Sequence, residues 1–134
     1  MNENKLREQI CTFASSMFNR GLTHGSTGNI SVRVDDDAIL VTPSGSSFGN
    51  LDPNEIVKVT KEGSLIGSSV PTKELPLHKA FYETRGMKSG AVVHLHSTNS
   101  VALSMLPGIN VDSVLPPYTP YSIMLLGKVK LLPF

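Results

Sequence analysis

Apolar residues recur at intervals of three and four near the start of the chain. They are Leu6, Ile10, Phe13, Ala14, Met17 and Phe18. This spacing is typical of one face of an amphipathic helix, and Gly21 stands where a helix C-cap is expected. We therefore predict a helix that ends near Gly21 and packs its apolar face on a core.

An alternating run of apolar and polar residues predicts a strand over 30–34, and two further short strands are predicted over 38–42 and 56–60. Asp35, Asp36 and Asp37 separate the first two strands. Three adjacent carboxylates suggest a metal site, but a solvated hairpin tip explains them better. Between the strands, 52–55 resembles a helical turn with proline at its start, and 61–63 has the residues of a hairpin turn.

A second helix is predicted after Pro71. Leu77, Ala80 and Phe81 recur at helical spacing, and Thr72 is a suitable N-cap. Glu74 and His78 lie one turn apart on the same helix face, so they could form a metal-binding pair. The alternative is that His78 is a partly buried residue of the packed helix.

The segment 91–96 is a predicted strand that carries two histidines. Successive side chains of a strand point to opposite faces, so His94 and His96 share one face while Val93 and Leu95 share the other. Two imidazoles at this spacing can converge on one metal ion. The alternative is that both are polar residues near a strand end and are satisfied by hydrogen bonds.

The remaining residues predict a short helix after Ser97 or Thr98 that stops at Pro107, and strands over 111–115 and 127–132. Segments 24–29 and 42–47 are rich in glycine, serine and threonine and adjoin strands. Because glycines allow close approach of the backbone and the hydroxyl groups donate hydrogen bonds, the two loops could hold one phosphate. Read singly, each is equally compatible with a surface turn.

The amino-acid composition argues against several classes of function. The 134 residues are 40% apolar and 17% charged, which is typical of one globular domain with a real core. Twelve basic residues against eleven acidic ones give a net charge of +1, so charge alone would not recruit nucleic acid or a membrane surface. The single Cys11 excludes an internal disulfide, and no apolar run approaches a membrane span, so we expect a soluble cytoplasmic protein.

Four motifs together resemble one known family. Segments 24–33, 42–45, 72–74 and 94–96 occur in the order and spacing of the class II aldolase/adducin superfamily, which includes L-fuculose-1-phosphate aldolase. The resemblance covers almost the whole chain. Lys73, directly before Glu74, makes the chain more similar to the subgroup that decarboxylates 3-oxo-tetronate 4-phosphate.

The resemblance implies an α/β fold, a three-layer α/β/α sandwich around a mostly antiparallel sheet, assembled as a homotetramer with sites between subunits. It implies one Zn²⁺ per subunit, bound by His94, His96 and Glu74, with Glu74 also acting as the acid and base. The residues implied to bind the substrate phosphate are Ser26, Asn29, Ser44, Gly45, Thr72 and Lys73. Tyr118 and Tyr121 are the candidates for an acid contributed by a neighbouring subunit.

The implied activity is that of a zinc-dependent lyase. It would decarboxylate 3-oxo-tetronate 4-phosphate to dihydroxyacetone phosphate and CO2 in carbohydrate catabolism. One alternative is a sugar-phosphate aldolase of the fuculose-1-phosphate type, and another is a non-catalytic adducin-like module or an inactive truncated form. The family's third metal histidine lies downstream of the pair and no histidine follows His96, so we expect 1–134 to be a single domain lacking the family's C-terminal portion.

Overall fold

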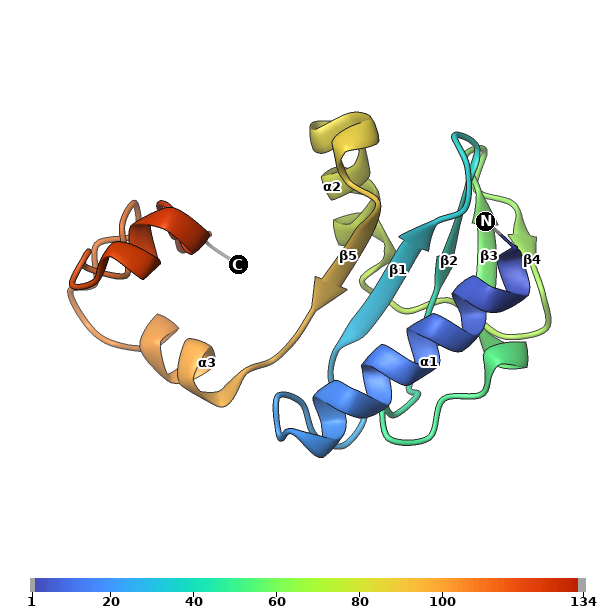
Figure 1. Ribbon diagram of the computed structural model, residues 1–134, viewed down its shortest axis with the longest axis horizontal. Helices are drawn as coiled ribbons and strands as arrows, with labels where there is room; N and C mark the ends of the chain where they lie inside the picture. The colour runs from blue at the N-terminus through green and yellow to red at the C-terminus, as the bar shows by residue number, and fades with distance from the viewer. Residues whose placement is uncertain (1, 133–134) are drawn as a thin grey trace. The chain divides into compact units, whose positions relative to one another are not determined.

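The computed structural model describes residues 2–132 and divides the chain into two compact units (Figure 1). The units are Met1–His96 and Ser97–Phe134. The first contains the sheet and every histidine, and the second contains short helical segments and loops. The expectation of a single domain stays a prediction.

A five-stranded sheet forms the centre of the first unit, in the order β4-β3-β2-β1-β5, and every neighbouring pair is antiparallel. Its helices and strands are α1 (Glu3–Asn19), β1 (Asn29–Arg33), β2 (Ala38–Val41), β3 (Val57–Thr60), β4 (Leu65–Ile66), α2 (Leu75–Arg85) and β5 (Ala91–His94), with short 3₁₀ turns at Pro53–Glu55 and Gly86–Lys88. This arrangement confirms the α/β fold with a mostly antiparallel sheet.

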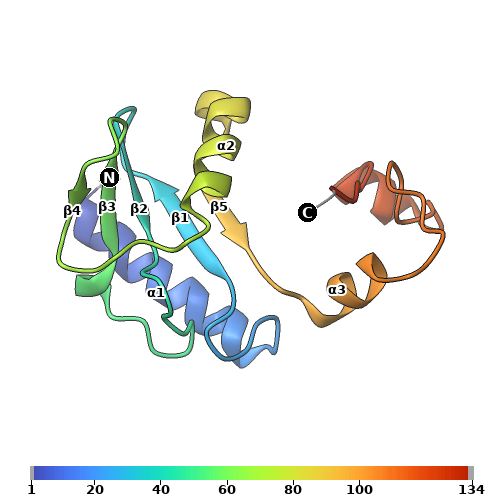
Figure 2. The same cartoon turned by 180° about the vertical axis from the view of Figure 1, so that it is seen from behind.

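Helices cover both faces of the sheet (Figures 1 and 2). The apolar stripe of α1 packs on one face, in a cluster made of Leu6, Ile10, Ala14, Ile30, Leu40, Phe48 and Ile56. On the other face, Tyr82 of α2 packs in a cluster with Ile39, Val41, Val57, Val59 and Val92. Because neighbouring residues of β2 point to opposite faces, Leu40 joins the first cluster while Ile39 and Val41 join the second.

Helix α1 ends as its sequence predicts, and an asparagine caps its start. The Asn2 side chain accepts a hydrogen bond from the Asn4 backbone N–H, at 3.0 Å, and caps the helix. The helix ends at Asn19, and Gly21 follows with a φ of +70°, a conformation that glycine adopts without a steric penalty. Within residues 2–132, no helix has both the length and the apolar character needed to cross a bilayer.

The predicted strands of the first unit are confirmed with small shifts of their ends. The segments 30–34, 38–42 and 56–60 correspond to β1, β2 and β3, and the three aspartates lie exposed between β1 and β2. Strands β1 and β5 pair in a register that sets Asn29 directly opposite His94. This register brings a predicted phosphate residue beside a predicted metal ligand.

In the second unit, helix α3 (Thr98–Ser104) confirms the predicted short helix, whereas the two strands predicted over 111–115 and 127–132 are wrong. These segments are joined by two backbone hydrogen bonds only, from Val114 to Val129 and from Leu131 to Val111. Pro116 and Pro117 follow at once and have no N–H to donate, so the pairing is not extended. A π-helix, η3 (Ser122–Leu126), directly precedes the second segment.

Candidate functional site

A row of polar side chains lies on the sheet face that α2 covers. Asn29 and Ser31 alternate along β1, so both point to that face, and His78 and Tyr82 lie one turn apart on α2. The Ser31 hydroxyl oxygen lies 2.7 Å from Nδ1 of His78 and 2.8 Å from the Tyr82 hydroxyl. Nε2 of His78 lies 2.5 Å from Oδ1 of Asn29. The four side chains form one buried chain of hydrogen bonds, with His78 fully buried.

Ser31 and Tyr82 were not predicted as members of this chain of hydrogen bonds, and His78 had two possible roles. The signal was present, because Glu74, His78 and Tyr82 follow one another at intervals of four on a single helix face. The structure decides between the two roles. Both ring nitrogens of His78 are engaged by side chains of β1, so it is a core residue here and has no free nitrogen for a metal.

The two predicted metal histidines lie together at the end of β5. Their ring centroids are 4.9 Å apart, with the ring planes tilted by 51°. His94 is half-buried as the last residue of β5, and its Nδ1 lies 3.3 Å from Oδ1 of Asn29. His96 is exposed two residues beyond the strand. One imidazole is therefore held by the sheet, and the other stands beside it in solvent.

Burial favours the neutral form of two histidines, His78 and His94. Loss of hydration lowers the pKa of His94, and the neighbouring His96 lowers it further, while Glu74 opposes both effects. For His78, burial and then His94 lower the pKa to about 4. A neutral imidazole is the form that binds a metal ion. At neutral pH, His94 is therefore in the protonation state that a metal ligand requires.

The buried His78 makes the free energy of unfolding depend on pH. Its pKa is about 4 in the folded chain against 6.5 for a free histidine, so the unfolded chain takes up the proton first. We expect the free energy of unfolding to fall by on the order of 2 kcal/mol through this residue as the pH drops from 6.5 towards 4. Urea unfolding at several pH values measures the slope. The slope should flatten in His78→Gln and persist in the exposed-histidine control His24→Gln; an unchanged slope in His78→Gln would contradict the assignment.

Glu74 directly precedes α2 as its N-cap residue, and its side chain makes no capping hydrogen bond. The prediction that Thr72 is the N-cap is therefore wrong. Thr72 lies two residues earlier, where its hydroxyl oxygen accepts a hydrogen bond from the Glu74 N–H at 3.3 Å. The reason is that Thr72 is tied to the sheet, because its own N–H donates to the carbonyl of Thr42. Thr72 thus turns the chain into the helix and leaves the Glu74 carboxylate exposed.

The second small-residue loop lies beside Thr72. The Ser44 N–H donates to the carbonyl of Val70 at 2.8 Å, and the Thr72 N–H donates to the carbonyl of Thr42 at 3.1 Å. The Thr42 hydroxyl in turn accepts a hydrogen bond from the Ile30 N–H, at the start of β1. These contacts bring predicted phosphate residues from two segments together, with Ser44 and Gly45 exposed and Thr72 buried.

The first small-residue loop is held against the end of β5. Gly28 has a φ of +86°, and a Cβ atom there would lie 3.0 Å from the carbonyl oxygen of His94. Only glycine combines this backbone conformation with so close an approach. The Thr23 hydroxyl closes the loop by donating to the carbonyl of Thr27 at 2.7 Å. Ser26, at the loop's outer part, is exposed.

The donor chemistry fits a transition metal, because imidazole and carboxylate are the ligands that zinc prefers. Within residues 2–132, however, no group of three or more histidine, cysteine or acidic side chains is placed to hold a metal ion. Two donors, His94 and His96, are in place, and Glu74 is near enough to influence the pKa of His94. The zinc site and its ligands stay a prediction.

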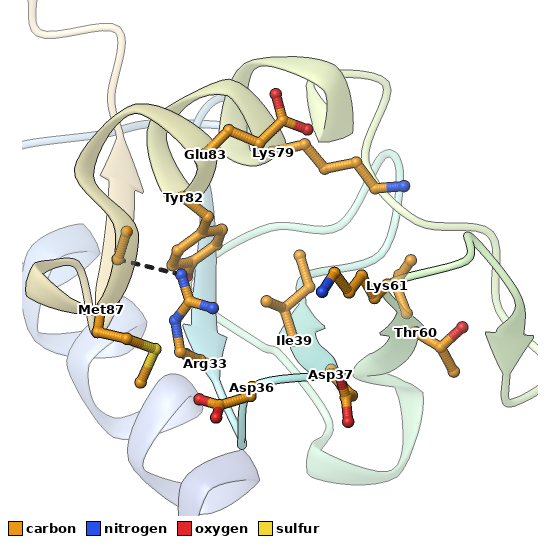
Figure 3. Close-up of a pocket in the computed structure, with 13 residues that line it drawn as sticks. Arg33, Asp36, Asp37, Ile39, Thr60, Lys61, Lys79, Tyr82, Glu83 and Met87 are labelled. Carbon is orange, nitrogen blue, oxygen red and sulfur yellow. Dashed lines mark hydrogen bonds between the residues drawn. The ribbon is translucent and has the colours of Figure 1, made fainter.

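Two cavities border α2. One, of about 460 Å³, is lined by Arg33, Tyr82 and Lys79 among others, and by none of the predicted site residues (Figure 3). There the Arg33 guanidinium lies 4.7 Å from the centre of the Tyr82 ring. The other, of about 690 Å³, lies between α2 and β5 and includes His94 in its wall.

In the second unit, Tyr118 and Tyr121 are exposed, and their catalytic role stays a prediction.

Comparison with known proteins agrees with these motifs. The class II aldolase and adducin N-terminal domain matches residues 8–134. The chain is 46% identical over 132 residues to 3-oxo-tetronate 4-phosphate decarboxylase of Escherichia coli O6:H1 (strain CFT073), an alignment that covers 98% of this chain and 62% of the relative. It is 36% identical over 106 residues to L-fuculose phosphate aldolase of Escherichia coli K12, covering 79% of this chain and 48% of the relative.

A solved structure shows the same fold. The crystal structure of YgbL from Escherichia coli, described as an aldolase, epimerase or decarboxylase, superposes with a TM-score of 0.91 at 43% identity. The superposition covers 98% of this chain and 63% of YgbL, so the chain spans less than two thirds of the proteins that it resembles. With a domain match over 8–134 and the fold in common, the chain belongs to the class II aldolase and adducin family.

Proposed function

We propose that the chain carries the catalytic residues of a lyase that decarboxylates 3-oxo-tetronate 4-phosphate to dihydroxyacetone phosphate and CO2. The observation that carries the proposal is the pair of imidazoles at the end of β5, with the Glu74 carboxylate near enough to act on His94. Relatives named as 3-oxo-tetronate 4-phosphate decarboxylases, at 46% and 45% identity, support this choice among lyases.

His94, His96 and Glu74 would hold a zinc ion. When bound, zinc supplies a positive charge that stabilises the negative charge developing on the substrate oxygens as the carbon–carbon bond breaks. The half-buried His94 would be the ligand with a fixed position, because its ring is hydrogen-bonded to Asn29 of the sheet. The exposed His96 and Glu74 can adjust to the substrate.

Glu74 would move the proton. Loss of CO2 leaves an electron pair on the substrate carbon that carried the carboxylate, and that carbon must then take up one proton. The Glu74 side chain is exposed and caps no backbone group, so the fold does not use its carboxylate. A group that is free in the fold is available for proton transfer.

The substrate phosphate would lie against the two small-residue loops and the turn before α2. Ser26, Ser44, Gly45 and Lys73 are exposed, and hydroxyl, backbone and ammonium groups all suit a phosphate. The other two predicted phosphate residues, Thr72 and Asn29, are buried. With the phosphate fixed there, the substrate would be held with its reacting end towards the histidines.

We further propose that the enzyme is a cytoplasmic homotetramer of carbohydrate catabolism, with one Zn²⁺ per subunit. Tyr118 or Tyr121 would reach the site of a neighbouring subunit. The exposure of both side chains, 87% and 74%, leaves them available for such a contact.

The reaction can be tested directly by supplying two substrates to the zinc-loaded protein. With 3-oxo-tetronate 4-phosphate we expect release of CO2 and dihydroxyacetone phosphate in equal amounts. Release of an aldehyde from L-fuculose 1-phosphate instead would favour the aldolase alternative. That alternative is supported by the 36% identity to L-fuculose phosphate aldolase. No turnover of either substrate would favour a non-catalytic module and overturn the proposal.

A further inference from the structure

One oxygen atom of the buried polar chain contacts two histidines. Oδ1 of Asn29 lies 2.5 Å from Nε2 of His78 and 3.3 Å from Nδ1 of His94. A carbonyl oxygen can only accept hydrogen bonds, so each of these two nitrogens must carry a hydrogen. The contact therefore selects one tautomer for each ring.

The other side of His78 fits this assignment. A neutral His78 with its hydrogen on Nε2 has an acceptor at Nδ1, which lies 2.7 Å from the Ser31 hydroxyl oxygen. That oxygen lies 2.8 Å from the Tyr82 hydroxyl and can accept its hydrogen. The hydrogen bonds then run in one direction, from Tyr82 through Ser31 and His78 to Asn29. His78 is fully buried, so water does not compete for these partners.

We propose that Asn29 is a positioning residue whose side-chain carbonyl keeps the hydrogen of His94 on Nδ1 and so leaves Nε2 free for a divalent metal ion. The inference rests on the proposed function, which assigns the metal to His94. Histidines that bind metals commonly donate their second N–H to an oxygen acceptor, which fixes both the tautomer and the ring orientation. Here the acceptor is itself held in place by His78.

The backbone pairing of β1 with β5 also favours the contact between Asn29 and His94. Asn29 and His94 are direct partners in the pairing of β1 with β5, and the neighbouring Gly28 packs against the His94 carbonyl. Cβ atoms of direct partners in an antiparallel pair lie about 4.5–5.5 Å apart, which suits a contact between two short side chains. The position of the amide is thus set by the strand register.

The two ends of the Asn29 amide can serve different partners. Its Oδ1 is used by His78 and His94, so only its NH₂ group is left for the substrate phosphate. This division suggests two variants. Asn29→Asp keeps an acceptor for His94 but has no donor for phosphate, whereas Asn29→Ala loses both.

The first measurement uses the metal-free chain and needs no activity. Long-range ¹H–¹⁵N correlation spectra of the imidazole nitrogens at pH 7.5 report the tautomer of each histidine. We expect His94 to carry its hydrogen on Nδ1 in the parent and in Asn29→Asp. In Asn29→Ala, the hydrogen should move to Nε2, the tautomer that water favours. A His94 already protonated on Nε2 in the parent overturns the inference, whatever the enzyme's reaction.

The second measurement is the affinity for Co²⁺, followed by its visible absorption. We expect Asn29→Ala to weaken binding about 10- to 100-fold, the range typical of lost outer contacts to a metal histidine. Asn29→Asp should stay within about threefold of the parent or bind more tightly, because a carboxylate is a stronger acceptor. Equal weakening in both Asn29 variants would overturn the inference.

Ser31→Ala is the matched control. It breaks the same buried chain of hydrogen bonds two links away from His94, so it should lower stability while leaving the Asn29–His94 contact in place. Loss of Co²⁺ affinity in Ser31→Ala as large as in Asn29→Ala would mean that general destabilisation is the cause, and would overturn the positioning role. If the Nδ1 tautomer is found but the parent binds no Co²⁺, the metal assignment in the proposed function fails while the tautomer result still supports the contact.

Discussion

Glu74→Gln should lower kcat about 10²- to 10⁴-fold, the contribution typical of a positioned acid or base. Glutamine keeps the size of the side chain but cannot exchange a proton. Because the Glu74 side chain is exposed and does not cap α2, the fold should not change. We expect KM to change much less than kcat. Steady-state rates of CO2 release, with circular dichroism to check folding, make the measurement.

The matched control is Glu83→Gln, which removes an exposed carboxylate from α2, the helix that Glu74 precedes. Glu83 lines the cavity in Figure 3, which contains none of the predicted site residues. This variant should keep the parent rate. If Glu74→Gln also turns over at the parent rate, Glu74 is not the proton carrier.

His94→Ala should abolish zinc binding. It removes the imidazole that the sheet holds in place and leaves only His96 of the pair, whose centroid lies 4.9 Å away in the parent. The loss should exceed the ~10- to 100-fold effect of removing an outer contact, because a direct ligand is lost. Elemental analysis after dialysis should give about one zinc per parent chain and almost none in the variant.

His24→Ala controls for the removal of any histidine. His24 is exposed, in the loop before β1, and lies outside the imidazole pair. It should retain the parent zinc content. Full zinc occupancy in His94→Ala would contradict the proposed ligand set and direct attention to other donors.

The sequence predicted the fold of the first unit well because its signals are local and repeat. The spacing of Leu6, Ile10 and Ala14 was enough to define α1, and the apolar run along 38–42 was enough to define β2. The second unit gave the same kind of signal over 111–115, but the structure shows no strand there. A local pattern shows that a segment could form a strand, but whether it does depends on pairing partners that the pattern does not contain.

The histidine pair of the site was predicted from the sequence. The buried residues that hydrogen-bond behind it were not. His94 and His96 stand out as a motif in the sequence, whereas Ser31 and Tyr82 are ordinary residues until β1 and α2 come together. Asn29 was assigned to the phosphate through the resemblance to the family. Its contacts with two imidazoles depend on which strands are neighbours, and a linear spacing does not show that.

The pairing of Asn29 with His94 also makes the site a check on correct folding. Side chains alternate along a strand, so a slip of β5 by one residue would set Val93 against Asn29 and turn His94 to the opposite face. Such a misfolded chain would keep its strands and its secondary-structure signal but would be unable to bind metal through the pair. With the proposed ligand set, metal uptake would therefore report the strand register, a property that circular dichroism does not detect.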